Sequence, residues 1–569
     1  MLLNDKYVWI LLFISLSVRI YLGIFTYVIQ NDSVAFMQNA EYFANGDFLN
    51  GLRHDYHPLY SLIMAGLYKI VPNMELSGTI ISIFFGTLTV IAFYLIGKGI
   101  FDQRIAFVSS VILAFHPYAV RFSADIISES TYFFFFTSAL GLGFFAITSG
   151  RLLLFALTGI CTAFAYLTRP EGIGILFIVI CWCLLKDFVR IKIVWKEKLV
   201  SILVLVISFL ALSSPYLISI KKETGAWHLT KKKNVSEIVG VKKMLSGPAN
   251  EPAKHQVRNN IPPFPSHRAP NRPHPGEQSN SGLKSSHGQA QDKDKGIVKR
   301  SNAGITKQTI SNDINLRTHL ESVLYIAKKY LSTFHPFLFI FLIIGVINWT
   351  RIKRERLFGL YITTIIIFYL FIMYRLNITQ MAYFGDIFQY PSRRHLMPLV
   401  IPAVFCVGIG VCATGTWMRE RFQIDRLRFG FKEVLRNVWI VQLIILVIVV
   451  GALLPKTLKP QGIGKLGVKK AGQWLRENSD KPSPAILSAS ARNAYYAGGR
   501  HIQMGSVSNA LSRARAKKAD YILITHKEYK AMGEKLQQSI GNKQIMLIYK
   551  YPEENSLNKH RIFLYKVIY

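Results

Sequence analysis

The sequence contains little charge and little cysteine. Charged residues make up 18% of the 569 residues, whereas apolar residues make up 51%. A soluble globular domain carries about a quarter charged residues, and the apolar residues here stand in long blocks, so we exclude a soluble enzyme and a disordered protein. All the cysteines lie inside apolar blocks, which excludes a disulfide scaffold and predicts no structural disulfide. They are Cys161, Cys181, Cys183, Cys406 and Cys412.

Acidic residues are scarce relative to basic ones. The chain has 68 lysines and arginines against 32 aspartates and glutamates, which gives a formal net charge of +36. Such an excess is typical of nucleic-acid-binding proteins, but many of the basic residues here stand in short clusters beside apolar blocks. That arrangement is typical of membrane topology, so we predict membrane lipids, and no nucleic acid, as partners.

The apolar blocks are long enough to cross a bilayer, which requires about 20 apolar residues. We predict a polytopic α-helical membrane protein with about eleven spans, the first of them an uncleaved anchor. A shorter run at 58–71, bounded by Pro58 and Pro72, predicts a juxtamembrane helix. The predicted spans are residues 7–29, 76–97, 105–120, 128–147, 152–167, 172–186, 199–220, 334–349, 357–374, 395–416 and 437–454.

Basic clusters occupy alternate loops between these spans, and the positive-inside rule places such loops in the cytoplasm. The remaining loops and the tail after residue 455 then face outward. The clusters contain Lys98, Arg104, Arg151, Lys186, Arg190, Lys192, Lys196, Lys198, Arg351, Lys353, Arg354, Arg356, Arg419, Arg421, Arg426 and Arg428.

Composition divides the chain into four parts. Residues 1–224 form an N-terminal membrane module with the first outer loop, and residues 321–455 form a second set of membrane helices. Between them, 225–320 is a polar outward loop, and its core 244–310 has too few apolar residues to fold. Residues 456–569 predict a small outward α/β domain with a helix at 466–478. Its predicted strands are 485–490, 521–525, 545–551 and 561–568.

Polar residues at the outward ends of the spans are the candidates for chemistry, because charge is costly to bury in a membrane. Carboxylates and arginines from five separate segments gather on this side. Asp125 and Glu129 are four residues apart, so we expect them on one helical face. The full set comprises Asp32, Asp47, His54, Asp55, His57, Tyr60, Asp125, Glu129, Arg169, Glu171, Arg393, Arg394 and His395.

Each candidate also has a plain structural interpretation. Arg393 and Arg394 suit interfacial anchors, and Asp125 and Glu129 suit solvated residues at a helix start. Arg169 can pair with Glu171 within its turn, and Asp32 can cap a helix beginning near Val34. Asp47 and Asp55 suit simple loop carboxylates. The shared membrane side of the set is what favours a site.

The order of short motifs resembles the GT-C membrane glycosyltransferases, above all the branch with protein O-mannosyltransferases and lipid A aminoarabinose transferases. The resemblance covers nearly the whole chain except 225–320. Two departures concern the first outer loop: Ser33 stands where the family often has a second acid, and Pro58 is single where the family often has two prolines. The motifs include Asp32, Gly46-Asp47-Phe48, His57-Pro58-Leu59-Tyr60, His116-Pro117, Ser128-Glu129, Thr168–Gly172, Arg393–Pro398, Trp474-Leu475-Arg476, Ala494–Gly499 and Ala519-Asp520-Tyr521.

The resemblance implies an inverting glycosyltransferase that moves a sugar from a polyprenyl-phosphate donor to a lipid, glycan or protein acceptor outside the cytoplasm, in a bacterial inner membrane. In this interpretation Asp32 is the general base, and Arg393 and Arg394 hold the donor phosphate, because arginine forms forked hydrogen bonds with phosphate. Asp125, Glu129, Arg169 and Glu171 line the substrate pocket, and His57 and Tyr60 orient the first loop.

Phosphate is a good leaving group, so the reaction needs no general acid, and no cofactor is expected. The missing second acid at Ser33 leaves any divalent metal without support. Two alternatives stay open: a membrane polymerase or ligase acting on lipid-linked glycans, and a transporter. A transporter is the weaker of the two, because it would place ionisable residues near mid-membrane, whereas the carboxylates here stand at outer helix ends.

Overall fold

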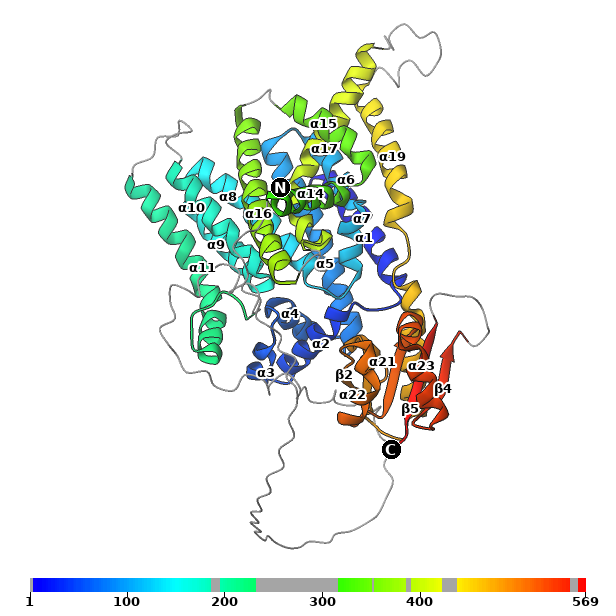
Figure 1. Ribbon diagram of the computed structural model, residues 1–569. Coiled ribbons are helices and arrows are strands. Elements are labelled where there is room, and N and C mark those ends of the chain that lie inside the picture. Colours follow the sequence, from blue (N-terminus) through cyan, green and yellow to red (C-terminus); the bar gives the residue numbers. More distant parts are fainter. Residues whose placement is uncertain are drawn as a thin grey trace.

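The computed structural model is a bundle of helices with a small α/β domain attached at one end (Figure 1). It describes residues 4–185, 195–231, 316–349, 353–384, 390–421, 437–552 and 561–569. The segment 244–310, predicted to lack a fold, lies outside the described residues, as do Lys186, Arg190, Lys192, Arg351, Arg426 and Arg428.

In the described part of the chain, seven helices have the length and composition of membrane spans. Two bent helix pairs extend this to nine, and α9 (Leu152–Thr168) and η1–α10 (Pro170–Ile173, Gly174–Leu185) are shorter apolar helices. Each of the predicted spans falls on one of these, which confirms the predicted helical membrane architecture. The long helices are α1 (Lys6–Ile24), α5 (Met74–Ile100), α8 (Glu129–Ser149), α11 (Trp195–Thr224), α16 (Lys353–Phe384), α17 (Arg393–Arg421) and α19 (Val438–Thr457).

One predicted span is broken. The block 105–120 was expected to be continuous, but α6 (Gln103–Ala114) and α7 (Pro117–Ala124) meet at an angle of 55°. Pro117 explains the break, because proline lacks an N–H and its ring clashes with the preceding turn. A second pair, α14 (Leu316–Thr333) and α15 (Pro336–Asn348), bends by 99° at Pro336.

The two sets of membrane helices share one core. Phe93 of α5 stacks on Phe405 of α17 with ring centroids 3.8 Å apart, and α17 also packs against α6, α15 and α19. Helix α17 is therefore surrounded by neighbours, and most of its residues are buried. Its first turn is held at the outer end of this core, where the candidate site residues stand.

Three short helices cover the outer end of the bundle beside the α/β domain: α2 (Asn31–Ala44), α3 (Phe48–Arg53) and α4 (Leu59–Tyr68) (Figure 1). The juxtamembrane helix predicted at 58–71 is α4. Asp47 caps α3 by accepting a hydrogen bond from the backbone N–H of Asn50 at 3.2 Å, which is the loop role considered for it.

The C-terminal domain is a five-stranded mixed sheet in the order β2-β1-β3-β5-β4. Strand β1 pairs in parallel with β2 and β3, whereas β5 runs antiparallel to β3 and β4. The predicted domain type is correct, but the sequence analysis missed β2, whose four residues include a single apolar one. The elements are α20 (Leu466–Asn478), β1 (Ala485–Ser488), α21 (Ala491–Tyr496), β2 (Arg500–Gln503), α22 (Ala510–Ala516), β3 (Tyr521–Thr525), α23 (His526–Gly541), β4 (Ile545–Tyr551) and β5 (Ile562–Val567).

Candidate active site

Asp32 and Arg394 meet at the outer end of the bundle. Helix α2 begins at Asn31 with Gln30 as its N-cap, so Asp32 lies in the first turn and is not the cap. A carboxylate there is favoured by the helix dipole. Arg394 lies in the first turn of α17, and its guanidinium donates to the Asp32 carboxylate at 2.6 Å. Residues 362 positions apart in the sequence thus form an ion pair.

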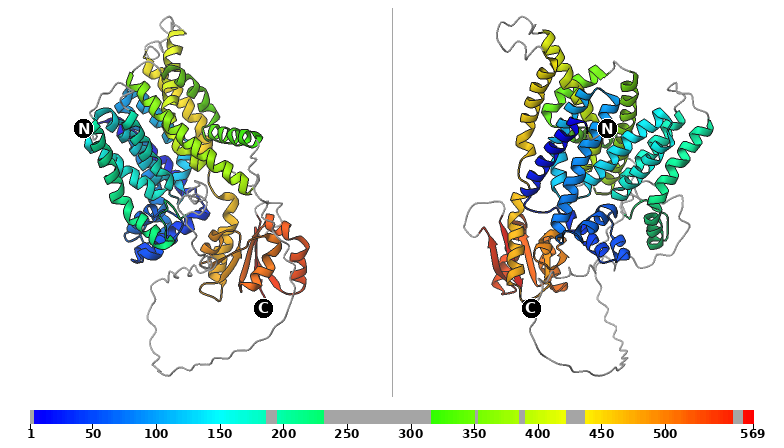
Figure 2. Two further views of the ribbon diagram at one scale, coloured as in Figure 1. Left: turned by 60° about the vertical axis from the view of Figure 1, so that its left-hand side comes forward. Right: turned by 180° about the vertical axis from the view of Figure 1, so that it is seen from behind.

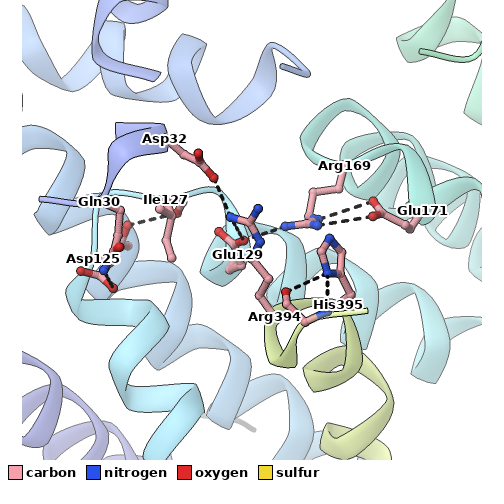
Figure 3. Close-up of polar contacts among 11 residues, drawn as sticks. Gln30, Asp32, Asp125, Ile127, Glu129, Arg169, Glu171, Arg394 and His395 are labelled. Carbon is pink, nitrogen blue, oxygen red and sulfur yellow. Dashed lines mark hydrogen bonds and ion pairs between the residues drawn. The ribbon is translucent and has the colours of Figure 1, made fainter. Parts of the chain in front are cut away.

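Arg169 extends this pair into a row of alternating charges. It follows α9 directly and precedes Pro170, and a residue before proline favours the extended conformation that Arg169 adopts (φ −151°, ψ 137°). Its guanidinium donates to Glu129 at 2.7 Å and to Glu171 at 3.3 Å, and Glu129 also lies 3.8 Å from Arg394. Figure 3 shows the row running from Asp32 through Arg394, Glu129 and Arg169 to Glu171.

We call Asp32, Glu129, Arg169, Glu171 and Arg394 the acid–arginine row. The row is most buried at its middle: the Glu129 side chain is 2% exposed, whereas those of Asp32 and Glu171 at the two ends are 24% and 25% exposed. Burial lowers the pKa of Arg169, but the Glu171 and Glu129 carboxylates raise it by more, so Arg169 remains charged. Arg169 does form the expected ion pair with Glu171 within the turn, and Glu129 pairs with the same guanidinium.

A cavity of about 240 Å³ lies beside the acid–arginine row. The cavity is lined by Tyr132, Arg169, Glu171, Tyr369, Met373, Arg394, His395, Pro398 and Leu399.

Three polar residues of this lining were not assigned a role from the sequence. Tyr369 donates its hydroxyl hydrogen bond to the Glu171 carbonyl at 2.7 Å, and Arg169 lies 5.8 Å from the centroid of the Tyr132 ring. The Nδ1 of His395 accepts from the Ser392 N–H at 3.2 Å, which leaves Nε2 as the protonated nitrogen of the neutral ring. The position of His395 beside two arginines was a usable signal, but tyrosines inside apolar spans carry none.

Asp125 and Glu129 do not share a helix face, contrary to the spacing argument. Asp125 is the C-cap of α7 and Glu129 is the first residue of α8, because the chain turns between them. Asp125 accepts a hydrogen bond from the Gln30 side chain at 3.0 Å, and Gln30 stands two residues before Asp32 of the acid–arginine row. Burial raises the pKa of Asp125 to about 6.

His57 and Tyr60 hold the outer helices in place. The Nδ1 of His57 lies 2.6 Å from the Tyr166 carbonyl oxygen at the end of α9, and the Tyr60 hydroxyl donates to the Gly78 carbonyl of α5 at 3.1 Å. Both side chains are buried, with residue exposures of 2% and 0%. They orient α4, as expected, but neither lines the cavity.

Arg393 points away from Arg394. Successive residues on an α-helix are about 100° apart, so the two neighbouring arginines leave α17 in different directions. The Arg393 guanidinium carbon lies 5.0 Å from the centroid of the Tyr118 ring, on another side of α17, and Arg393 is absent from the cavity lining. The expectation that both arginines hold one phosphate is therefore corrected: of the two, only Arg394 faces the cavity.

The C-terminal domain forms hydrogen bonds with the segment that leads into α2. The Tyr496 hydroxyl accepts from the Ile29 N–H at 3.0 Å, and Arg492 donates to the Ile29 carbonyl at 3.1 Å. The Ser490 hydroxyl donates to the Asn31 side chain at 2.6 Å. Three residues in and beside α21 thus fix the backbone immediately before Asp32. Among the described residues, no group of three His, Cys, Asp or Glu side chains is arranged to hold a metal ion.

Several proteins of known structure share the fold of this chain. Residues 55–218 match the family model of dolichyl-phosphate-mannose-protein mannosyltransferases. Two structures of ArnT from Cupriavidus metallidurans superimpose with a TM-score of 0.54: the complex with undecaprenyl phosphate (10% identity, 99% of this chain and 98% of that one) and the apo state (11%, 98% and 97%). The chain has the GT-C fold.

The GT-C fold also includes the oligosaccharyltransferase of Archaeoglobus fulgidus, solved with Zn and sulfate. That structure matches with a TM-score of 0.50 at 13% identity, over 91% of this chain and 68% of that one. No curated protein sequence matches the chain. The family match over residues 55–218 and the GT-C fold agree with the resemblance found in the sequence.

Proposed function

We propose that the chain is an inverting glycosyltransferase that takes a single sugar from a polyprenyl-phosphate donor. The observation that carries this proposal is the acid–arginine row, whose two arginines line one cavity. It offers a carboxylate to accept a proton and two arginines to face a phosphate.

Asp32 is the proposed general base. It takes the proton of the acceptor hydroxyl while that oxygen bonds to the anomeric carbon of the sugar. The bond from that carbon to the phosphate oxygen breaks, and its electron pair leaves with the phosphate. One displacement with one base inverts the anomeric configuration. Tyr56 beside Asp32 has a pKa raised by burial and by the Asp32 charge, so Tyr56 stays a neutral hydroxyl and does not compete as a base.

Arg394 and Arg169 are the proposed partners of the leaving phosphate. Both line the cavity, and guanidinium groups stabilise charge that develops on phosphate oxygens. Each already bonds a carboxylate, but a guanidinium has five N–H donors, so the pairing with Asp32 and Glu129 leaves donors for a ligand. The carboxylates hold both arginines in position before a donor arrives. The similar ArnT structure was solved with undecaprenyl phosphate, which supports a lipid-phosphate donor here.

The proposed site faces outward, and the protein lies in a bacterial inner membrane with the site on the periplasmic side. Helix α2, which carries Asp32, lies at the end of the bundle where the C-terminal domain is attached (Figure 1), and Ser490 of that domain donates to the Asn31 side chain. Basic residues stand at the opposite helix ends: Lys98 in the last turn of α5, Arg151 before α9, and Arg419 and Arg421 in the last turn of α17. The positive-inside rule supports this orientation.

The acceptor is a lipid, glycan or protein outside the cytoplasm. A second candidate function is transfer of a lipid-linked oligosaccharide as a block, by a polymerase or ligase, and the similarity to an oligosaccharyltransferase favours it. The match of residues 55–218 to the dolichyl-phosphate-mannose-protein mannosyltransferase model favours a single sugar. A transporter has no comparable support, because the family match and the fold are those of transferases.

A donor panel tests this proposal. Purified full-length protein is incubated with radiolabelled polyprenyl-phosphate monosaccharides, with lipid-linked oligosaccharides, and with membrane acceptors. We expect release of polyprenyl phosphate and labelled acceptor from at least one monosaccharide donor, and none with an Asp32→Asn variant. Transfer from the oligosaccharide donors alone would overturn the single-sugar proposal, and activity of the Asp32→Asn variant equal to wild type would overturn the assigned site.

A further inference from the structure

Two cations lie against one buried tyrosine outside the acid–arginine row. The Arg393 guanidinium carbon lies 5.0 Å, and the Lys456 Nζ 4.9 Å, from the centroid of the Tyr118 ring. The three residues come from the first turn of α17, the last turn of α19 and the first turn of α7. Distant parts of the chain thus bring two positive charges to a single aromatic ring.

A third cation completes the group. The Nζ of Lys329, near the end of α14, lies 5.6 Å from the centroid of the Tyr325 ring, and the Tyr325 hydroxyl donates to the Pro391 carbonyl two residues before Arg393. Arg393 is close enough to act electrostatically on both Lys329 and Tyr325. We call Lys329, Arg393 and Lys456, with Tyr118 and Tyr325, the cation cluster.

The described residues offer the cation cluster no acidic partner. Among the residues that the structure describes, Lys329, Arg393 and Lys456 make no ion pair with an aspartate or glutamate. The other titratable groups acting with Lys456 are His116 and His335, which supply no negative charge. Like charges held close together repel one another, and a bound anion relieves that repulsion.

The position of the cluster indicates where such an anion comes from. All three cations stand at outer helix ends, and α14 bends by 99° from α15, so that it projects sideways from the bundle (Figure 2). Large apolar residues of α14 are exposed, including Leu320 and Leu324 at 58% each. An apolar face beside a basic group is typical of a helix lying in the membrane interface. The cluster therefore lies at the level of lipid head groups.

We propose that the cation cluster binds the phosphate of a membrane lipid, at a site separate from the catalytic cavity. Arg393 and Lys456 hold the phosphate oxygens, Lys329 adds charge from α14, and Tyr118 forms the wall behind them. Arg393 and Arg394 leave the first turn of α17 about 100° apart, so the two phosphate sites lie on different sides of this turn. The lipid site needs no glycosyl transfer, so it stands or fails independently of the proposed function.

Counting bound lipids tests this inference. Purified full-length protein in neutral detergent is titrated with polyprenyl phosphate and, separately, with phosphatidylglycerol, and native mass spectrometry counts the lipids bound. The variant combines Arg393→Gln with Lys456→Gln, and the control is Arg421→Gln at the opposite end of α17. Thermal unfolding in detergent verifies that both variants fold.

We expect the double variant to bind one lipid phosphate fewer than wild type, and its affinity at that site to fall roughly tenfold to over a hundredfold. The control should match wild type. The loss is expected whether or not the catalytic cavity also binds a lipid, because the count drops by one from either starting number.

Two results would overturn the inference. The first is an unchanged lipid count in a folded double variant, which would make Arg393 and Lys456 interfacial anchors. The second is inorganic phosphate displacing the lipid at equal concentration, which would assign the site to a free anion. A preference for polyprenyl phosphate over phosphatidylglycerol would identify the carrier lipid as the ligand, and equal binding of both would identify phospholipids in general; both results support a lipid-phosphate site.

Discussion

The acid–arginine row and the cation cluster lie on two sides of the same helix start, yet their charges are arranged in opposite ways. In the row, Arg394 and Arg169 are held by Asp32, Glu129 and Glu171. In the cluster, Arg393 and Lys456 rest on an aromatic ring, with no acidic partner among the described residues. Arginines fixed by carboxylates suit a site that must be positioned before reaction, whereas unpaired cations suit a site that receives an anion.

The largest expected effect is a loss of turnover when the proposed base in the acid–arginine row is replaced. Asp32→Asn removes the proposed base but keeps the shape and a hydrogen-bond acceptor beside Arg394, and a positioned base contributes about 10²–10⁴ in rate. We expect turnover to fall by that factor with donor binding largely kept. The matched control is Asp47→Asn in the same outer helices, because asparagine caps a helix about as well as aspartate. Equal losses in both variants would point to damaged outer helices.

The next effect compares the neighbouring arginines. Arg394→Gln should lower kcat/KM for the donor by roughly tenfold to over a hundredfold, because a hydrogen bond to a charged group is worth about 1.5–3 kcal/mol. Arg394→Lys should restore only part of this, since lysine lacks the fork geometry. Arg393→Gln should change kcat/KM for the donor far less in detergent. Steady-state kinetics with varied donor concentration measure kcat/KM for each variant. Equal losses in the Arg393 and Arg394 variants would show that both arginines belong to one site.

A stability effect is expected from Asp125. Burial raises its pKa from 3.8 to about 6, so the folded protein takes up this proton at a higher pH than the unfolded chain. Stability from this group is therefore present at low pH and is lost as the pH rises through about 4 to 6, by up to roughly 3 kcal/mol. We expect Asp125→Asn to unfold at higher temperature than wild type at pH 7 and to lose this advantage at pH 4.

Thermal unfolding in detergent across that pH range measures the difference between the Asp125→Asn variant and wild type. The exposed cap Asp102 provides the control, because Asp102→Asn should leave the pH dependence of wild type unchanged. A constant offset between Asp125→Asn and wild type from pH 4 to 7 would contradict the raised pKa.

The smallest effect tests whether the C-terminal domain helps to position Asp32 of the acid–arginine row. Tyr496→Phe removes the acceptor for the Ile29 N–H, a bond worth about 1 kcal/mol, close to the backbone of Asp32. We expect kcat to fall roughly threefold to tenfold with donor KM unchanged. Tyr529→Phe lies in the same domain on the exposed Gln537 contact and should be silent. A rise in donor KM without a change in kcat would contradict a positioning role for Tyr496.

Much of the fold follows from local composition. Apolar blocks and basic clusters are properties of short segments, so the spans and the small α/β domain were predictable. The break at Pro117 was not predicted, because Pro215, Pro398 and Pro402 lie inside continuous helices and a proline alone does not tell which helix will bend. Strand β2 was missed because Arg500–Gln503 has no local pattern and becomes a strand only by pairing with β1.

The sequence predicts which residues gather at the site better than it predicts how they are oriented. Asp32, Glu129, Arg169, Glu171 and Arg394 were gathered because they share one membrane side, and they do meet. The separation of Arg393 from Arg394 depends on which way the first turn of α17 faces, and the buried hydrogen bonds of His57 and Tyr60 depend on packing between helices. The cation cluster needs four helices in place before it exists, so no local pattern could predict it.

The anomeric configuration of the product tests the proposed mechanism most directly. Nuclear magnetic resonance of the linkage formed from a donor of defined configuration reports the outcome of the displacement. One displacement with Asp32 as the base predicts a product whose anomeric configuration is opposite to that of the donor. A product with the configuration of the donor would require a second displacement, and would contradict the role assigned to Asp32.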